Sequence, residues 1–142
     1  MTPQTYAVES MKQPDLEEYM FPLWDSVYQT TVDLINSRST DREDMDSILT
    51  AMAIDNETED ILGYISENGC ELFIEKLVEA GAGHLQPNAR WQCAELIRRR
   101  RPQNGDRVLK ILLSDEDEYV VKRAKNAIMD KDADCDPETI LG

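Results

Sequence analysis

Two stretches near the C-terminus repeat each other at a fixed distance, and this repeat limits what the chain can fold into. Four small or apolar residues recur 31 positions later, each set with the spacing i, i+4, i+7 and i+8 of one helix face. They are Ala89, Cys93, Leu96 and Ile97, followed by Val120, Ala124, Ala127 and Ile128. Residues 108–113, between the two sets, are also apolar at helical spacing. A unit of two helices recurring every roughly 30 to 45 residues indicates an α-solenoid.

The remaining apolar residues predict helices along the rest of the chain. Helix starts are expected at about 22, at 41 and near 56, and a fourth helix carries apolar residues from Leu72 to Val78. Residues 87–101, 104–113 and about 118–129 complete the set. No stretch alternates with period two for long enough to be a strand. We therefore expect a single all-α domain, a short α-solenoid of about three hairpins over 22–129, preceded by an N-terminal helix and a polar segment 1–21.

Particular residues mark the expected helix ends. Thr40 and Glu43 have the spacing of a capping box, and Pro87 suits the first turn of a helix. Gly69 is expected to end one helix. Residues 81–83 (Gly-Ala-Gly) are expected to end the next, because glycine readily takes the left-handed conformation.

Residues 119–128 resemble the second helix of a HEAT-like repeat. That family has an acidic or proline turn followed by a Val, a basic residue, a small Ala and an Ala-Leu pair. Here the turn 114–118 is acidic and is followed by Val120, Arg123 and Ala124. Residues 87–94 are a second instance, and the resemblance covers 69–129 best. It implies a HEAT-like fold, and most HEAT-like proteins bind other proteins.

The net charge of −14, with a pI near 4.3, falls entirely in residues 1–86, because residues 87–142 hold as many bases as acids. Residues 41–60 carry eight acids and one base. An acidic surface repels nucleic acid, whose phosphates need clustered Lys and Arg, and attracts basic proteins. No apolar run approaches the roughly 20 residues that span a bilayer. We expect a cytoplasmic protein that binds neither nucleic acid nor membrane.

Residue types that carry catalysis or bind metal give little signal. Cys70, Cys93 and Cys135 are an odd number at unrelated spacings, which fits a reducing compartment, and Cys93 is expected in the core. His84 lies in a glycine-rich turn and is expected to be exposed. Its distance in sequence from the cysteines matches no zinc signature. We therefore expect no enzyme, with no catalytic residue, no metal and no cofactor.

Two charged runs have alternative interpretations. Aspartates alternate over residues 130–136 like the first half of an EF-hand loop, but Cys135 stands where the loop needs Gly. An acidic, frayed tail over 130–142 is the better account. Arg98–Arg101 could contact nucleic acid. We prefer pairing with neighbouring acidic turns at a helix C-terminus.

The size, fold and charge of the chain are similar to those of HEAT-like immunity proteins from bacterial polymorphic and contact-dependent toxin systems. This resemblance implies a protein-binding inhibitor that covers the active site of a basic, nuclease-like toxin with carboxylates. A general HEAT-like adaptor or scaffold subunit is the alternative.

Alternating turns in a solenoid lie on two opposite rims. The turns at 55–60, 81–87 and 115–118 are expected on one rim, and Asp41–Asp46 and Arg98–Arg101 on the other, where they partly offset each other. We expect the first rim, with an aromatic anchor, to bind the partner. The predicted partner-binding residues are Asp55, Glu57, Glu59, Asp60, Trp91, Asp115, Glu116, Asp117, Glu118 and Tyr119.

Overall fold

The chain is helical throughout the part that the structure describes. In the computed structural model, the backbone is described for residues 17–141 and the side chains for residues 24–130. Within these bounds it forms seven helices and no strand, which confirms the all-α class. Most of the polar segment 1–21 lies outside the described residues.

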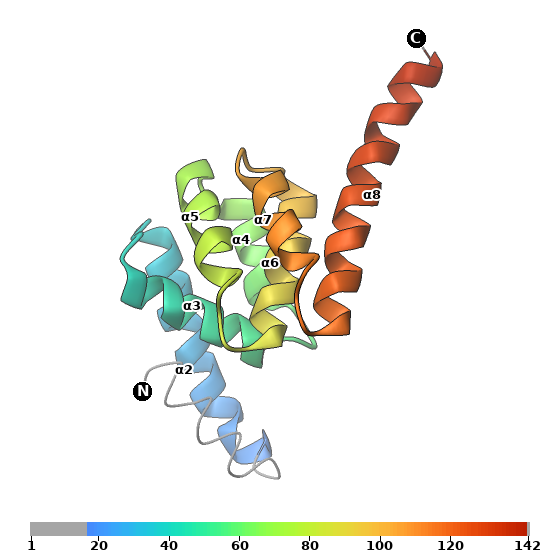
Figure 1. Ribbon diagram of the computed structural model, residues 1–142. Helices are drawn as coiled ribbons and strands as arrows, with labels where there is room; N and C mark the ends of the chain where they lie inside the picture. The colour runs from blue at the N-terminus through green and yellow to red at the C-terminus, as the bar shows by residue number, and fades with distance from the viewer. Residues whose placement is uncertain (1–16, 142) are drawn as a thin grey trace.

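The helices follow one another with short turns (Figure 1). They are α2 (Glu17–Asn36), α3 (Arg42–Ile54), α4 (Asp60–Asn68), α5 (Glu71–Gly81), α6 (Pro87–Arg100), α7 (Gly105–Leu112) and α8 (Glu118–Leu141). None of the helices in the described part is both long and apolar enough to cross a bilayer.

Helices α3, α5 and α7 pack side by side in this order, and α4, α6 and α8 form a second such set. Helix α5 contacts α3 and α7, whereas α6 contacts α4 and α8. Each successive pair, α3–α4, α5–α6 and α7–α8, is also in contact, and α2 packs on α3 and α4. Helix α6 therefore lies at the centre of the molecule, touching every described helix except α2 in its main contacts.

The repeated residues form the core. Of the eight residues that define the 31-residue repeat, only Ile128 is half-buried and the others are buried. Leu72 departs from the expected pattern, because it is exposed at the start of α5 while Phe73 and Ile74 are buried. Ile111, within the apolar run at 108–113, is also exposed.

Helix α6 is buried on all sides although its sequence is polar. Every residue from Ala89 to Ile97 is buried, including Arg90, Gln92 and Glu95. A buried polar group is costly unless it is hydrogen-bonded. The Gln92 amide donates to the carbonyls of Met52 in α3 and Asn88, so α6 is tied to its neighbours by polar bonds as well as by packing.

Gly69 and Gly81 stand at the helix ends predicted for them, but not in the left-handed conformation, because no described glycine has a positive φ. Gly69 ends α4 in an extended conformation, and Arg101 ends α6 in the left-handed one. Gly81 instead permits close packing. A Cβ there would overlap Sγ of Cys93 and lie 3.0 Å from Cδ2 of Leu49.

Several helix ends differ from the expected positions. Helix α2 begins at Glu17, five residues before the expected start, because Pro22 lacks only one backbone N–H and does not prevent an earlier helical turn. Helix α3 begins one residue late, with Asp41 as N-cap. The Ser39 hydroxyl, rather than Thr40, accepts the Asp41 N–H (3.2 Å) and donates to the Asp44 carboxylate (2.6 Å).

The expected frayed tail is helical in its backbone, since α8 continues to Leu141. Residues 130–141 contain no glycine that would end a helix, and α8 continues through Pro137 although a proline inside a helix removes one hydrogen bond and crowds the preceding turn. A continuous helix also cannot form the loop of an EF-hand. The side chains of residues 131–142 lie outside the description.

Candidate functional site

Three turns lie along one edge of the group formed by α3 to α8, on its lower side in Figure 1, where part of α2 extends further down. They are the α3–α4, α5–α6 and α7–α8 turns. We call this edge the rim and define it as residues 55–60, 82–86 and 113–118. The C-terminal end of α6, which carries Arg98–Arg101, lies at the opposite edge.

Arg90 joins two of the rim turns. Its Nε and Nη2 donate to the Asp115 carboxylate at 2.8 and 3.1 Å. Its Nη1 donates to the carbonyls of His84 and Leu85 at 2.8 and 3.2 Å. Both charged side chains are nearly buried, so this bidentate pair fixes the α5–α6 turn against the α7–α8 turn.

Asp55 is buried and serves the fold. Its carboxylate accepts the Ile61 N–H at 2.8 Å and the Thr58 hydroxyl hydrogen bond, so it caps α4. Burial raises the pKa of Asp55, although these two hydrogen bonds oppose the rise. Asn56, the expected marker of this helix start, instead donates to the Ala53 carbonyl. Asp55 is thus not available to a partner, unlike the expectation.

The other acids of the α3–α4 turn are more accessible. Glu57 and Asp60 are exposed, and no basic side chain of the described part pairs with either. Glu59 is half-buried, has a left-handed backbone and lies 3.8 Å from Nη2 of Arg99. Two of the four predicted binding acids here are therefore free carboxylates at the surface.

The α7–α8 turn divides in the same way. Asp115 pairs with Arg90 and also accepts the Asp117 N–H at 2.9 Å. Asp117 caps α8 by accepting the N–H groups of Tyr119 and Val120 at 2.9 and 3.2 Å. These two aspartates hold the turn in shape.

The two remaining acids of this turn, Glu116 and Glu118, are exposed. Neither forms an ion pair within the described part of the chain.

Trp91 and Tyr119, the predicted aromatic anchors, meet in one group. Their rings make an edge-to-face contact with centroids 5.3 Å apart. The Arg123 guanidinium lies 4.7 Å from the Trp91 ring centroid and donates to the Tyr119 hydroxyl at 3.0 Å. Trp91 is buried, and only Tyr119 offers a substantial exposed surface.

Glu95 organises the charges above this aromatic group. Its buried carboxylate accepts hydrogen bonds from Arg98, Arg99 (2.9 Å) and Arg123 (2.8 Å). Burial alone would raise the pKa of Glu95, but these guanidinium groups outweigh it and lower the pKa to about 2. Glu95 therefore stays ionised over the physiological range.

The arginine run is engaged with the protein itself. Arg98 also pairs with Asp130 at 3.0 Å, and Arg100 donates to the last carbonyls of α4, including that of Gly69 at 2.7 Å. This is the pairing at a helix end that we preferred. The acidic partners of Arg98–Arg100 are Glu95, Asp130, Glu59 and Glu71, whereas Asp46 lies 3.2 Å from His84 near the rim.

His84 is not the exposed loop residue that its turn suggested. Only 8% of its side chain is exposed. Nδ1 accepts the Gln86 N–H at 3.1 Å, and Nε2 lies 3.3 Å from the Thr50 hydroxyl and 3.2 Å from Asp46. Burial lowers the pKa of His84, partly offset by Asp46. The imidazole therefore accepts a backbone N–H of its own turn on one side and contacts α3 on the other.

No group of three or more potential metal ligands occurs among the described residues. Cys93 is buried, which raises the pKa of its thiol to about 12, and neither it nor Cys70 forms a disulfide.

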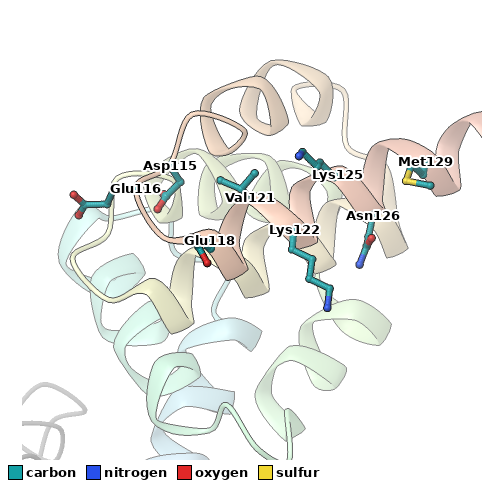
Figure 2. Close-up of a pocket in the computed structure, with 8 residues that line it drawn as sticks. All are labelled: Asp115, Glu116, Glu118, Val121, Lys122, Lys125, Asn126 and Met129. Atoms are coloured by element: carbon teal, nitrogen blue, oxygen red, sulfur yellow. The ribbon is translucent and has the colours of Figure 1, made fainter.

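An open hollow follows the outer face of α8 and the turn before it (Figure 2). It is lined by Asp115, Glu116, Glu118, Val121, Lys122, Lys125, Asn126 and Met129.

Sequence reasoning missed the residues that shape the rim. Arg90 and Glu95 look like ordinary surface charges on a polar helix, and only the burial of α6 reveals their role. The repeat gave one signal, because the positions that match Arg90 and Glu95 at the 31-residue offset hold the uncharged Val121 and Asn126. Leu85 gave no periodic signal, because it stands alone in a turn.

The structure thus contains three features that could form a site: the rim, the ion pairs around the buried Glu95, and the pair of Trp91 and Tyr119. They offer exposed carboxylates and one tyrosine face to the outside. Compared with models of protein families, with curated proteins and with solved structures, the chain matches none.

Proposed function

We propose that this chain is a protein-binding inhibitor whose rim holds a basic protein. In its most specific form, the proposal is an immunity protein that neutralises a nuclease-like toxin in the cytoplasm of a bacterium by covering the toxin's active site. It acts by binding and not by catalysis. The charge distribution of the described residues carries this proposal.

The arginines and the acids are used differently in this molecule, whereas the lysines of the described part are exposed and form no ion pair within it. Arginine charges are mostly consumed by internal ion pairs, which involve Arg90, Arg98, Arg99, Arg100, Arg107 and Arg123. Glu57, Asp60, Glu116 and Glu118 remain exposed on the rim without such a pair. The outward field of the rim is therefore negative, which accelerates the approach of a basic protein. Carboxylates at such a surface can take the place of substrate phosphates.

The packing of the helices supports a short α-solenoid as the scaffold. In this proposal α3–α4, α5–α6 and α7–α8 are three HEAT-like hairpins, and α2 covers the first. The contacts of α5 with α3 and α7, and of α6 with α4 and α8, are those that stacked hairpins make. Such stacking puts every within-hairpin turn on one edge, so the acids of separate turns act on the same partner.

The test compares two quadruple variants with the same change in charge. The rim variant replaces Glu57, Asp60, Glu116 and Glu118 by lysine. The control variant replaces Asp33, Asp41, Glu43 and Glu67 by lysine, four exposed acids outside the three rim segments. Asp55 stays unchanged in both, because it caps α4.

The partner is first captured from the native cell with the wild-type chain and identified, and its binding kinetics are then measured with each variant. We expect a basic partner whose association slows about 10- to 100-fold with the rim variant at low salt, and much less with the control. Equal effects of both variants would reject the rim as the binding edge.

Co-expression separates the inhibitor from the adaptor. If the captured partner stops growth when expressed alone and the wild-type chain restores growth, the chain is an inhibitor. If the partner is harmless alone, the alternative of a general HEAT-like adaptor replaces the inhibitor. A neighbouring reading frame that encodes a basic protein favours the first outcome.

A further inference from the structure

Leu85 stands out at the middle of the rim. It lies in the α5–α6 turn and is 90% exposed, more than any other large hydrophobic side chain that the structure describes. Leu72, at the other end of α5, is 58% exposed. An exposed leucine does not contribute the free energy that its burial would give. Leu85 therefore adds nothing to the stability of the fold through burial.

The turn holds Leu85 in a fixed position. The His84 N–H donates to the Gly81 carbonyl at 3.1 Å, and the Gln86 N–H donates to Nδ1 of His84 at 3.1 Å. The carbonyls of His84 and Leu85 both accept from Nη1 of Arg90. The backbone on either side of Leu85 is therefore bonded within the protein, and the exposure of the side chain is not a result of a loose loop.

The elements next to the turn of Leu85 carry exposed acidic side chains. Asp115, bound to the same Arg90, begins the turn that presents the exposed carboxylates Glu116 and Glu118. On the other side, His84 contacts the exposed Asp46 of α3. A single apolar side chain is thus exposed on a turn whose backbone is fixed, between elements that carry exposed acids.

We propose that Leu85 is the apolar anchor of the rim, which packs into an apolar patch flanked by lysine and arginine side chains on a basic protein. This inference rests on the proposed function and names the chemistry of the surface that the rim recognises. Binding energy concentrates in a few central side chains that lose water completely, while the surrounding charges set approach and orientation. A rigid anchor also loses little conformational freedom on binding.

The charges favour a basic protein over other occupants. A second copy of this chain would place one negative rim against another, and like charges at close range oppose such a contact. An anionic lipid surface would be repelled for the same reason.

The experiment uses two synthetic peptides of the same length and lysine content. In one, leucines form an apolar stripe on a helix between the lysines; in the other, serine and glutamine replace those leucines. Binding of each peptide is measured by calorimetry at low salt to the wild type, to Leu85→Ser and to the matched control Leu72→Ser. Circular dichroism and the unfolding midpoint verify that each variant is folded.

We expect the wild type to bind the leucine peptide at least about tenfold more tightly than the polar peptide. Leu85→Ser should weaken binding of the leucine peptide about five- to tenfold and leave the polar peptide unchanged, because only the apolar contact is removed. Leu72→Ser should change neither. Equal effects of the two substitutions, or no effect of Leu85→Ser, would overturn the anchor.

The rim variant distinguishes a failure of the Leu85 anchor from a failure of the proposed function. If lysines at Glu57, Asp60, Glu116 and Glu118 leave both peptides bound as in the wild type, the acidic rim fails together with the proposed function. If they abolish binding while Leu85→Ser has no effect, only the anchor fails. A wild-type dimer that Leu85→Ser converts to monomer in light scattering would assign Leu85 to self-association and would also refute the anchor.

Discussion

Replacing Gly81 by alanine tests the closest approach between two helices of the core. Gly81 is the last residue of α5 and does not use a positive φ, so alanine fits its backbone. In a helix alanine is favoured over glycine by roughly 0.5–1 kcal/mol. The new Cβ, however, would overlap Sγ of the buried Cys93 and lie 3.0 Å from Cδ2 of Leu49.

Overpacking of this kind costs on the order of 1–3 kcal/mol, so it outweighs the helical gain. We expect Gly81→Ala to lower the free energy of unfolding by about 1–2 kcal/mol. In a Cys93→Ala background the overlapping sulfur is absent. The same substitution should then be neutral or stabilise by about 0.5 kcal/mol.

Urea unfolding followed by circular dichroism measures the four chains of this double-mutant cycle. Gly63→Ala is the control, because a Cβ at that helical glycine meets nothing within 4 Å. It should stabilise both backgrounds alike by about 0.5–1 kcal/mol. If Gly81→Ala has the same effect with and without Cys93, the reasoning from close approach is wrong.

Two further predictions concern the helical phase and the buried histidine. Ala124→Leu should cost on the order of 1–3 kcal/mol because Ala124 is fully buried, whereas Lys125→Leu, one exposed residue on, should change the free energy of unfolding by less than about 0.5 kcal/mol. Equal losses in thermal unfolding would show that the phase of α8 is misplaced. Burial lowers the pKa of His84, so the unfolded chain binds this proton more readily, and the free energy of unfolding should fall as the pH drops below about 6.5. His84→Asn should flatten that part of the pH profile, and an unchanged slope between wild type and variant would contradict the assignment.

Much of the fold could be predicted because apolar spacing reports burial directly. The 31-residue repeat identified the core face of α6 and α8, and Pro87 gave the start of α6 correctly. Helix ends were less predictable where several residues compete for one role. Ser39 took the place of Thr40, and Asp55 took that of Asn56, because their hydroxyl and carboxylate reach free N–H groups of the next turn.

The candidate site was only partly predictable from sequence. In the sequence, an acidic residue that caps a helix or pairs with an arginine cannot be told from one that faces water. Asp55, Asp115 and Asp117 proved to hold turns together, whereas Glu57 and Glu116 are exposed. Asp115 is bound by Arg90, which is 25 residues away, so no local pattern contains this contact. Asp55 and Asp117 accept N–H groups only a few residues further on, and the shape of each turn decides which acid reaches them.

Helix α6 constrains how this domain can change in evolution. Arg90 depends on Asp115, and Glu95 depends on Arg123, and both partners belong to the last hairpin. A deletion that removed α7 and α8 would take its carboxylate partner from Arg90, whereas Glu95 would lose Arg123 but keep Arg98 and Arg99 of its own helix. Any other pair of helices in the place of α7 and α8 would have to supply the same two groups to α6, a carboxylate for Arg90 and a guanidinium for Glu95.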